Sequence, residues 1–287
     1  NRRPSGACCA ILPAGGIELT TITSRANDTV RATRALCEAR ARREQGLHLV
    51  EGEKLVREAA ASGAGIARLF VEEGFPAPAA DAEEVYTVSR SVMEALCESR
   101  TPQHVCAAVR TPGTALPASF PAGLIIVLDR VQDAGNVGTI LRTADAFGAS
   151  GVLLGAGSAD PYSGKALRAA MGSTYHLPLW QGETADALDR LQREGFCCLC
   201  GHLGGDETPP AVSARMALVI GNEGNGVSDA VAARCTLWRL PMRGRAESLN
   251  AAVAAALMIY ELSGRMASPC ASAGKEGYAH ETGPHRR

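Results

Sequence analysis

The chain lacks any long hydrophobic run and any excess of charge of one sign. No stretch approaches the roughly 18 apolar residues of a membrane-spanning helix, so we expect no membrane span. Lys and Arg number 29 against 30 Asp and Glu, which leaves a net charge of −1. Any surface that binds a polyanion must therefore be local. The chain starts with Asn1-Arg-Arg-Pro and no Met, and the short apolar stretch 7–12 is broken by Pro13, which makes a poor signal peptide. We interpret these first residues as left over from a leader or from an expression tag.

The ten cysteines lack the spacing of a disulfide framework or of a zinc site. One cluster, Cys197, Cys198 and Cys200, has His202 nearby but no second ligand pair. Because residues 196–199 form the apolar run of an expected strand, we interpret the cluster as buried and structural. We therefore expect a reduced, cytoplasmic protein that holds no metal.

Two common nucleotide-binding signatures are also missing. The glycines of 221–226 have the spacing G-x-x-G-x-G, which is not the dinucleotide-binding fingerprint. Gly164-Lys165 is followed by Ala166, which lacks the metal-binding hydroxyl of a phosphate-binding loop. These absences disfavour a nucleotide-dependent oxidoreductase, and we find no internal repeat.

The chain does contain enough apolar sequence for two domains, since 46% of its 287 residues are hydrophobic. Residues 20–110 alternate between helical and strand patterns and indicate a small α/β unit. Residues 111–122 include three prolines and are typical of a linker. In 123–264, continuous apolar strands alternate with helices, which favours a mostly parallel sheet covered on both faces. Residues 265–287 have no periodicity, and we expect a disordered tail.

The first of three motifs, residues 133–144, follows the strand expected at 124–128. It begins with turn residues and continues as a helix, whose free N–H groups favour an anion. Asn136 lies at its start. Arg142 lies about one and a half turns further along, where it could reach a phosphate or a ribose oxygen. The alternative is an ordinary strand, turn and helix with a solvated arginine.

The second motif, residues 219–226, is a glycine-rich turn that follows the strand expected at 216–220. Its three glycines remove Cβ atoms and permit positive φ, so the backbone can come close to a flat ligand. Glu223 could be a plain surface acid, but its place between the glycines favours a polar contact with the substrate.

The third motif, residues 240–256, ends a strand with a proline and enters a helix through Ser248, which we expect to be the N-cap. A cap and nothing more is the alternative role of Ser248. The Ala-rich face of the helix reflects either helix propensity or close packing against a dimer partner. All three motifs follow strands, and ligands of parallel sheets bind beyond the carboxyl ends of the strands.

In this order the motifs resemble those of the SpoU (TrmH-like) RNA ribose 2′-O-methyltransferases of the SPOUT class. The resemblance covers residues 123–264 and includes Arg168-Ala-Ala-Met-Gly-Ser173 and His176-Leu-Pro-Leu179. Residues 20–110 resemble the ribosomal-protein-L30e-like substrate-binding domain of that family. The segments that carry this second resemblance are Ile22-Thr-Ser-Arg25, Arg42-Arg-Glu-Gln-Gly46 and Leu49-Val-Glu-Gly-Glu53.

The resemblance implies S-adenosylmethionine as the cofactor, a trefoil knot in the larger domain and a homodimer that completes the site. It implies a cofactor pocket lined by Gly201, Gly221, Leu240 and Leu249. It gives catalytic and substrate-positioning roles to Asn136, Arg142, Glu223, Ser248 and Asn250.

One local concentration of positive charge lies in the smaller unit. We expect a helix capped by Asp28 that runs through Arg43 and ends at Gly46. Its arginines form either a solvated face or contacts to RNA phosphates, and phosphate binding would weaken with salt. The candidate RNA-binding residues are Arg25, Arg31, Arg34, Arg42 and Arg43.

The activity that the resemblance implies is methylation of a ribose 2′-hydroxyl, a group that RNA has and DNA lacks. Arg142 would hold a phosphate and steady the developing oxyanion, while Asn136, Ser248 and Asn250 orient the hydroxyl. The L30e-like unit favours ribosomal RNA, with transfer RNA as the alternative. A non-catalytic RNA-binding ribosome-assembly factor of the same fold is the competing hypothesis, and the presence of all four side chains disfavours it.

Overall fold

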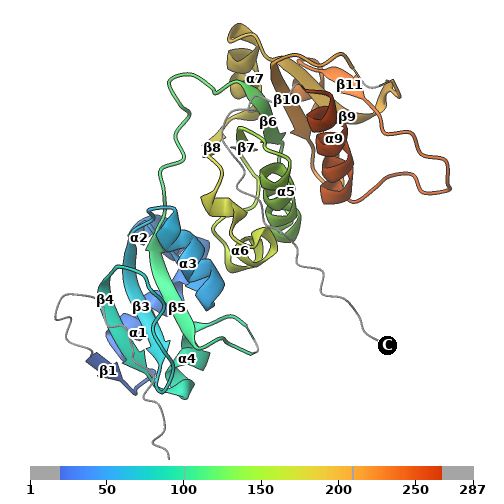
Figure 1. Ribbon diagram of the computed structural model, residues 1–287. Coiled ribbons are helices and arrows are strands. Elements are labelled where there is room, and N and C mark those ends of the chain that lie inside the picture. Colours follow the sequence, from blue (N-terminus) through green and yellow to red (C-terminus); the bar gives the residue numbers. More distant parts are fainter. Residues whose placement is uncertain (1–19, 100, 209, 267–287) are drawn as a thin grey trace, which may run out of the picture.

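The computed structural model describes residues 20–99, 101–208 and 210–266. In this part of the chain, two α/β units each have their own sheet and are joined by one connecting segment (Figure 1). The apolar stretch 7–12 lies outside the described residues, as does the predicted tail from residue 267 onward. None of the described helices is long and apolar enough to cross a membrane.

The smaller unit begins with β1 (Thr20–Ile22), α1 (Asp28–Arg34), the 3-10 helix η1 (Ala35–Cys37) and α2 (Ala39–Gln45). It continues with β2 (Leu47–Glu51), α3 (Glu53–Ala61), β3 (Ile66–Glu72), β4 (Ala82–Val88), α4 (Arg90–Leu96) and β5 (Val105–Arg110). The strand order is β1-β4-β3-β5-β2. Strands β1 and β3 run parallel to β4, while β5 is antiparallel to both of its neighbours.

The helix expected between Asp28 and Arg43 is interrupted in the structure. Asn27, not Asp28, caps α1, because its side chain accepts hydrogen bonds from two backbone N–H groups of the first turn. At Glu38 the backbone is extended (φ −89°, ψ 133°), which separates η1 from α2. Gly46 ends α2 in the left-handed conformation (φ 64°), so the predicted stop is confirmed.

The larger unit begins with β6 (Gly123–Leu128), α5 (Ala134–Ala146), β7 (Gly151–Gly155), α6 (Gly164–Ala170), the 3-10 helix η2 (Ser173–Tyr175) and β8 (Leu179–Gly182). It continues with α7 (Thr184–Arg193), β9 (Cys197–Asp206), β10 (Arg215–Ile220), α8 (Asp229–Ala232), β11 (Thr236–Trp238) and α9 (Ala251–Arg265). All neighbouring strands in the order β11-β9-β10-β6-β7-β8 are parallel. The expected fold class, a mostly parallel α/β domain with a smaller α/β domain before it, is confirmed.

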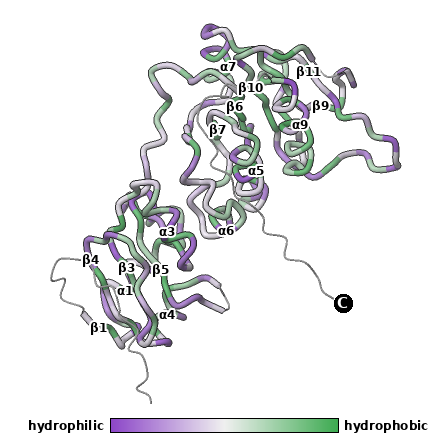
Figure 2. Tube along the Cα trace, viewed as in Figure 1, coloured by the Kyte–Doolittle hydropathy of each residue, from purple (hydrophilic) through white to green (hydrophobic). Residues whose placement is uncertain are grey.

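Helices cover both faces of the larger sheet, because its strands are apolar on both sides. Helices α5, α6 and α9 pack on one face, and α7 and α8 pack on the other. The residues of β10 and α9 are largely hydrophobic along their length, as Figure 2 shows. Strand β10 pairs with β6 so that Ile220 lies opposite Leu128. Motifs one and two therefore begin side by side at the same edge of the sheet.

The proline-rich segment 111–122 connects the two sheets and is anchored along its length. Phe120 is buried, with the Arg190 guanidinium 5.0 Å from the centre of its ring. Arg190 also donates to the carbonyl of Ala118 at 2.7 Å, and Glu194 accepts from the backbone N–H of Phe120 at 2.8 Å. Leu116 packs against the core of the larger unit. The linker is therefore a fixed connection.

Polar contacts also join the two units directly. The guanidinium Nε of Arg42, on α2, lies 2.8 Å from Oδ2 of Asp160, which precedes α6. The fully buried ring of His48, on β2, has its Nε2 atom 2.7 Å from the Tyr175 hydroxyl in η2. Burial lowers the pKa of His48 to about 3, so this ring is neutral at physiological pH.

Candidate active site

The second half of β9, the loops after β10 and β11, and α9 enclose a cleft of about 360 Å³. This volume is typical of small-molecule sites, which span roughly 300–1,000 Å³. The cleft is lined by all four residues expected to bind the cofactor and by two expected catalytic residues: Gly201, Gly221, Leu240, Leu249, Glu223 and Ser248. Residues that lie far apart in sequence are thus brought to one place.

The wall of the cleft is largely apolar, with backbone polar groups at the glycine turn. Its apolar side chains include Leu203, Ile220, Leu240, Leu249 and Met258. Met258 packs closely on Gly201, where an added Cβ would lie 3.0 Å from the Met258 sulfur. A surface of this kind suits a flat heterocycle with a small number of hydrogen-bonding groups.

Two glycines shape the turn 221–226 for different reasons. Gly226 has a positive φ of 65°, which strains any residue with a Cβ. An added Cβ on Gly221 would overlap the backbone of Gly226 and Val227. Asn222 closes the turn, since its backbone N–H and C=O both bond to Gly226 at 2.9 Å. The turn therefore requires glycine at its first and last positions.

Glu223 joins this turn to the N-terminus of α5. Its Oε1 accepts from the Asn136 Nδ2 at 2.9 Å and from the backbone N–H of Asp133 at 3.1 Å, while Oε2 accepts from the N–H of Gln132 at 3.1 Å. Partial burial raises the pKa of Glu223, but the bonds from Asn136 and the backbone outweigh it and hold the pKa below its usual range. The ionised carboxylate fixes the amide of Asn136.

Asn250 joins motif one to motif three. Its Nδ2 donates to Asn136 Oδ1 at 3.1 Å, and its Oδ1 accepts from the backbone N–H groups of Ala252 and Val253 at 2.9 and 3.2 Å. Asn250 is therefore the N-cap of α9, and the prediction that Ser248 caps this helix is wrong. Ser248 lies at the cleft, and its hydroxyl bonds to no other group within the described part of the chain.

Arg142 lies on the exposed side of α5 and does not line the cleft of its own chain. Six residues separate it from Asn136, which on a helix of 3.6 residues per turn places the two about 120° apart around the axis. Across residues 20–266, leaving out the two that the structure does not describe, Arg142 has no hydrogen-bond or ion-pair partner. The structure brings Asn136, Glu223 and Asn250 together but leaves Arg142 apart from them.

Arg42 is buried and not available to RNA, so the structure corrects the prediction that this residue contacts RNA. Its side chain is only 7% exposed. It pairs with Asp160 and donates to the carbonyls of Leu36 and Cys37 at 2.9 and 2.8 Å. The guanidinium is thereby committed to the contact between the two units.

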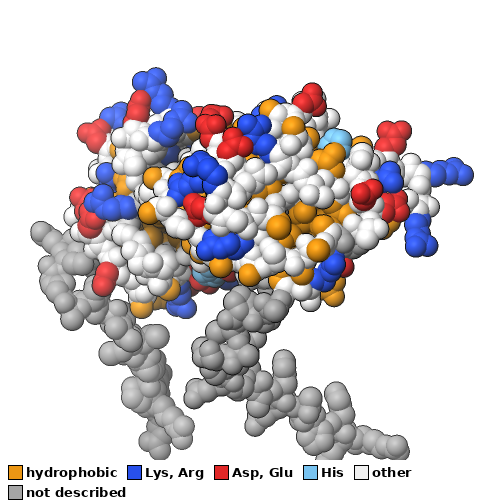
Figure 3. Space-filling view, turned by 90° about the horizontal axis from the view of Figure 1, so that it is seen from above, with side chains coloured by type: hydrophobic (Ala, Val, Ile, Leu, Met, Phe, Trp, Pro, Cys, Tyr) orange, Lys and Arg blue, Asp and Glu red, His pale blue; other side chains and the backbone are white. Residues whose placement is uncertain are grey.

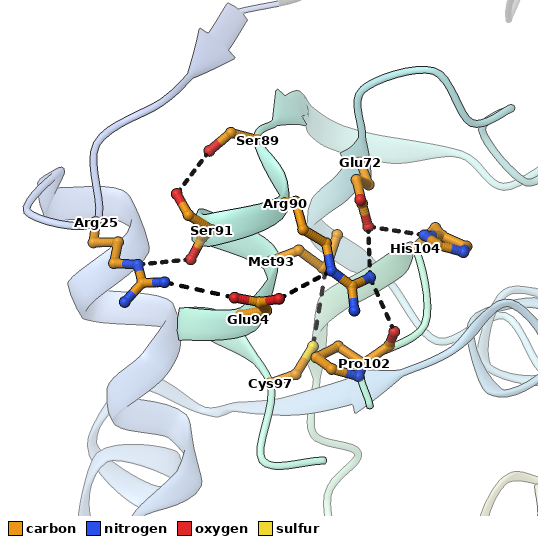
Figure 4. A network of polar contacts seen from close by, with 10 residues as sticks. All are labelled: Arg25, Glu72, Ser89, Arg90, Ser91, Met93, Glu94, Cys97, Pro102 and His104. Atoms are coloured by element: carbon orange, nitrogen blue, oxygen red, sulfur yellow. Dashed lines mark hydrogen bonds and ion pairs between the residues drawn. The ribbon is translucent and has the colours of Figure 1, made fainter. Parts of the chain in front are cut away.

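Arg25 and Arg34 are exposed but already hold neighbouring elements together. Arg25 donates to the backbone carbonyl of Ser91 at 2.8 Å and pairs with Glu94 at 3.6 Å (Figure 4). Arg34 donates to the carbonyl of Cys97 at 2.8 Å. Both side chains thus tie the N-terminal segment to α4.

Arg31 and Arg43 remain as the open cations of this predicted group. Arg31 is exposed and, within the described residues, its sole ion-pair partner is Asp28, one helical turn away. Arg43 is exposed and has no side-chain partner among the residues that the structure describes. RNA contact by α1 and α2 stays a prediction that now depends mainly on these two side chains.

The cysteine cluster on β9 consists of free thiols. Burial raises the pKa of Cys198 to about 11 and that of Cys200 to about 12, so both are protonated at neutral pH. Among the residues described, no group of three or more His, Cys, Asp or Glu side chains could hold a metal ion.

Some cleft residues were missed by the sequence reasoning. Met258 follows Ala251 and Ala254 at helical spacing, so the period of the expected helix could have found it. Leu203 gave no such signal, because the strand expected at 196–199 extends to Asp206 in β9. The part of β9 beyond the expected strand places Leu203 at the cleft.

Solved structures with this arrangement are methyltransferases. The structure of an AdoMet-bound rRNA methyltransferase from Sinorhizobium meliloti matches with a TM-score of 0.78 and 32% identity, over 87% of this chain and 99% of that one. The SpoU methyltransferase AviRb from Streptomyces viridochromogenes, in complex with AdoMet, matches with a TM-score of 0.76 and 27% identity, over 83% and 98%. Fold and site together define an AdoMet-dependent α/β methyltransferase.

The chain belongs to the SpoU rRNA methylase family, whose model matches residues 123–260. The model of the MRM3-like substrate binding domain matches residues 27–107. Among the relatives is the 23S rRNA (guanosine(2553)-2′-O)-methyltransferase RlmP of Bacillus subtilis. It is 36% identical over 250 residues, which cover 85% of this chain and 99% of the relative.

Proposed function

We propose that this chain transfers a methyl group from S-adenosylmethionine to a ribose 2′-hydroxyl of ribosomal RNA. The observation that carries the proposal is that motifs two and three line one cleft, while Asn136 of motif one bonds to both Glu223, which lines the cleft, and Asn250. The Bacillus subtilis relative, which acts on 23S rRNA, supports ribosomal RNA as the substrate class.

The residues of the cleft fit S-adenosylmethionine. Leu240, Leu249 and Met258 offer apolar contacts to an adenine ring, and the backbone at Gly221 offers hydrogen bonds to its edge. The bound cofactor supplies an activated methyl on a sulfonium, whose positive charge disappears during transfer. A site with few charged side chains favours that loss of charge.

The protein's own part in the reaction is to orient and stabilise. Asn136 and Asn250 form a hydrogen-bonded amide pair next to the cleft residues Glu223 and Leu249, and the hydroxyl-bearing Ser248 lines the cleft itself. These groups hold the ribose hydroxyl in line with the methyl. Glu223 keeps Asn136 in place, and Arg142 binds a phosphate and stabilises the oxyanion as the proton leaves for that phosphate or for water.

Because Arg142 does not line the cleft of its own chain, we propose that a second copy supplies it in a homodimer. The outer face of α9 supports this, since Val253, Leu257 and Tyr260 are 48, 47 and 63% exposed. Tyr260 contacts Phe147, the C-cap of α5, in an edge-to-face pair, and Phe147 is itself 40% exposed. An apolar stripe of this kind on a helix is typical of an interface.

Two other hypotheses lead to different results. A transfer RNA methyltransferase would share the site but modify another RNA, and a ribosome-assembly factor would bind RNA without methyl transfer. Calorimetry with S-adenosylmethionine distinguishes the ribosome-assembly factor from the two enzymes, because a site that has lost its activity binds the cofactor poorly. We place the protein in the cytoplasm, where ribosomal RNA matures and free thiols persist.

The experiment that tests the proposal compares 2′-O-methyl positions across ribosomal and transfer RNA from cells with and without the protein. We expect one or a few ribosomal positions to lose methylation, and to regain it when the purified protein and S-adenosylmethionine are added. Loss of methylation at a transfer RNA position alone would show that the substrate is transfer RNA. No change at any position would contradict the proposed methyltransferase activity.

A further inference from the structure

The segment between β11 and α9 is a long loop that projects from the larger unit at the right of Figure 1. Both ends of the loop line the cleft, through Leu240 and Met242 on one side and Ser248 and Leu249 on the other. Within the described residues, 240–249 make no backbone–backbone hydrogen bond, and 243–249 are exposed. The loop therefore borders the reaction site, and its backbone and side chains are open to contacts with a substrate.

This loop carries cations that the protein itself does not neutralise. Most Lys and Arg side chains of the described chain bond to a carboxylate or a backbone carbonyl. Within that part of the chain, the exceptions are Arg43, Lys54, Arg142, Arg243 and Arg245.

Paired and unpaired arginines lie close together in the sequence of this loop. Arg239, at the start of the loop, pairs with Glu207 at 3.1 Å, whereas Arg243 and Arg245 beyond it stay unpaired in the described structure. Lys and Arg side chains stand out at the end of the molecule where this loop projects (Figure 3). In a chain of net charge −1, such unpaired cations are the places where a polyanion is attracted.

The chemistry of the substrate brings an anion to this place. A ribose 2′-hydroxyl is on the carbon next to the one that bears the 3′-phosphate. An RNA strand that presents the hydroxyl to the methyl must therefore bring its backbone phosphates to the rim of the cleft. Arginine suits such phosphates, because its planar guanidinium can donate two parallel hydrogen bonds.

We propose that Arg243 and Arg245 are substrate-positioning residues, which bind RNA phosphates beside the target ribose. The inference rests on the proposed methyl transfer and names the contacts that hold its substrate. Neither residue lines the cleft, so neither is needed to bind the cofactor. Their contribution is to RNA affinity and to the position of the strand.

The test uses the full chain, unmodified 23S rRNA transcribed in vitro and S-adenosylmethionine. The variant is Arg243→Gln with Arg245→Gln. The matched control is Arg57→Gln with Arg193→Gln, which removes the same charge from exposed positions on α3 and α7. For the double variant we expect the KM for RNA to rise about 10-fold or more, and the slope of log Kd against log salt to fall by about 1–2. Cofactor affinity, measured by calorimetry, should equal that of wild type.

A second variant that keeps the charge, Arg243→Lys with Arg245→Lys, should restore most of the salt slope, because a lysine ammonium also pairs with phosphate. The proposal is overturned if the double Gln variant matches the control in KM and salt slope, or if its only defect is weaker cofactor binding. An inactive wild-type protein that binds no cofactor would instead sink the methyltransferase function itself. The two failures are therefore distinguishable.

Discussion

Arg142 carries the largest single share of the proposed chemistry. We expect Arg142→Ala to lower kcat by about 100-fold or more, because losing one preorganised donor to a developing oxyanion typically costs roughly 10²–10³. Cofactor affinity should not change, because the proposed contacts of Arg142 are to the RNA phosphate and the oxyanion and not to the cofactor. Single-turnover methylation and calorimetry measure the two quantities, with Arg193→Ala as the control. Near-normal turnover by Arg142→Ala would refute its role.

Glu223 should make stability depend on pH in the acid range. Its folded-state pKa is depressed, so the carboxylate stabilises the fold above its unfolded pKa of about 4.3, and this contribution is lost as pH falls through the folded pKa. We expect Glu223→Gln to lower Tm at pH 7 and to match wild type in strong acid. Thermal unfolding between about pH 3 and pH 7 checks this. A difference that persists unchanged in strong acid would show that charge is not the cause.

Single residues were predictable where a motif fixes their place on a turn. Gly221 and Leu240 come just after β10 and β11, so their position at the cleft follows from the sheet, whereas Leu249 lies just before α9. The residue that caps α9 could not be predicted, because Ser248 and Asn250 are both good N-caps. Only the path of the preceding loop determines which of the two lies at the start of the helix. The burial of Arg42 depends on Asp160, 118 residues away, and no local pattern reports it.

At the scale of elements, α9 is where the dimer proposal is tested. We expect wild type to be a dimer in light scattering, and Leu257→Glu to be a monomer, because a charge would be buried in the apolar interface. Arg265→Gln, at the exposed end of the same helix, should leave the dimer intact. A wild-type monomer at micromolar concentration would contradict the proposal.

Elements with strong periodicity and clear ends were predicted closely. The strands expected at 124–128 and 216–220 agree within one residue with β6 and β10, since buried apolar runs delimit them. Strand β9 is longer than expected, because after a register shift its last residue, Asp206, pairs with Trp238 of β11, although residues 201–205 include three glycines. Pairing with a distant strand here overrides local propensity.

For the whole molecule, the buried pair between Arg42 and Asp160 is a test of how firmly the two units dock. Removing one partner of a buried pair costs about 3–5 kcal/mol, but Asp160 is 31% exposed and can be partly solvated. We therefore expect Arg42→Ala to lower the free energy of unfolding by about 2–3 kcal/mol. Urea unfolding measures it, with the surface residue Arg40→Ala expected to change it by less than about 0.5 kcal/mol. Equal effects of the two substitutions would contradict docking through this pair.

The two-unit architecture could be read from the sequence, because continuous apolar strands spaced by helices dictate a parallel sheet. How the units meet could not. The contact depends on polar side chains of both units, such as His48 and Tyr175, that have no partner until the chain is folded. The trefoil knot that the family resemblance implies stays a prediction.

Asn250 serves two structures at once, since its carbonyl oxygen caps α9 and its amide nitrogen reaches Asn136. A ribose that draws the amide toward itself therefore acts on the first turn of the helix whose outer stripe is proposed to bind a second copy. By thermodynamic reciprocity, whatever substrate does to subunit association, association does to substrate affinity by the same factor. Titrating RNA affinity against protein concentration would then report a coupling transmitted through one amide group.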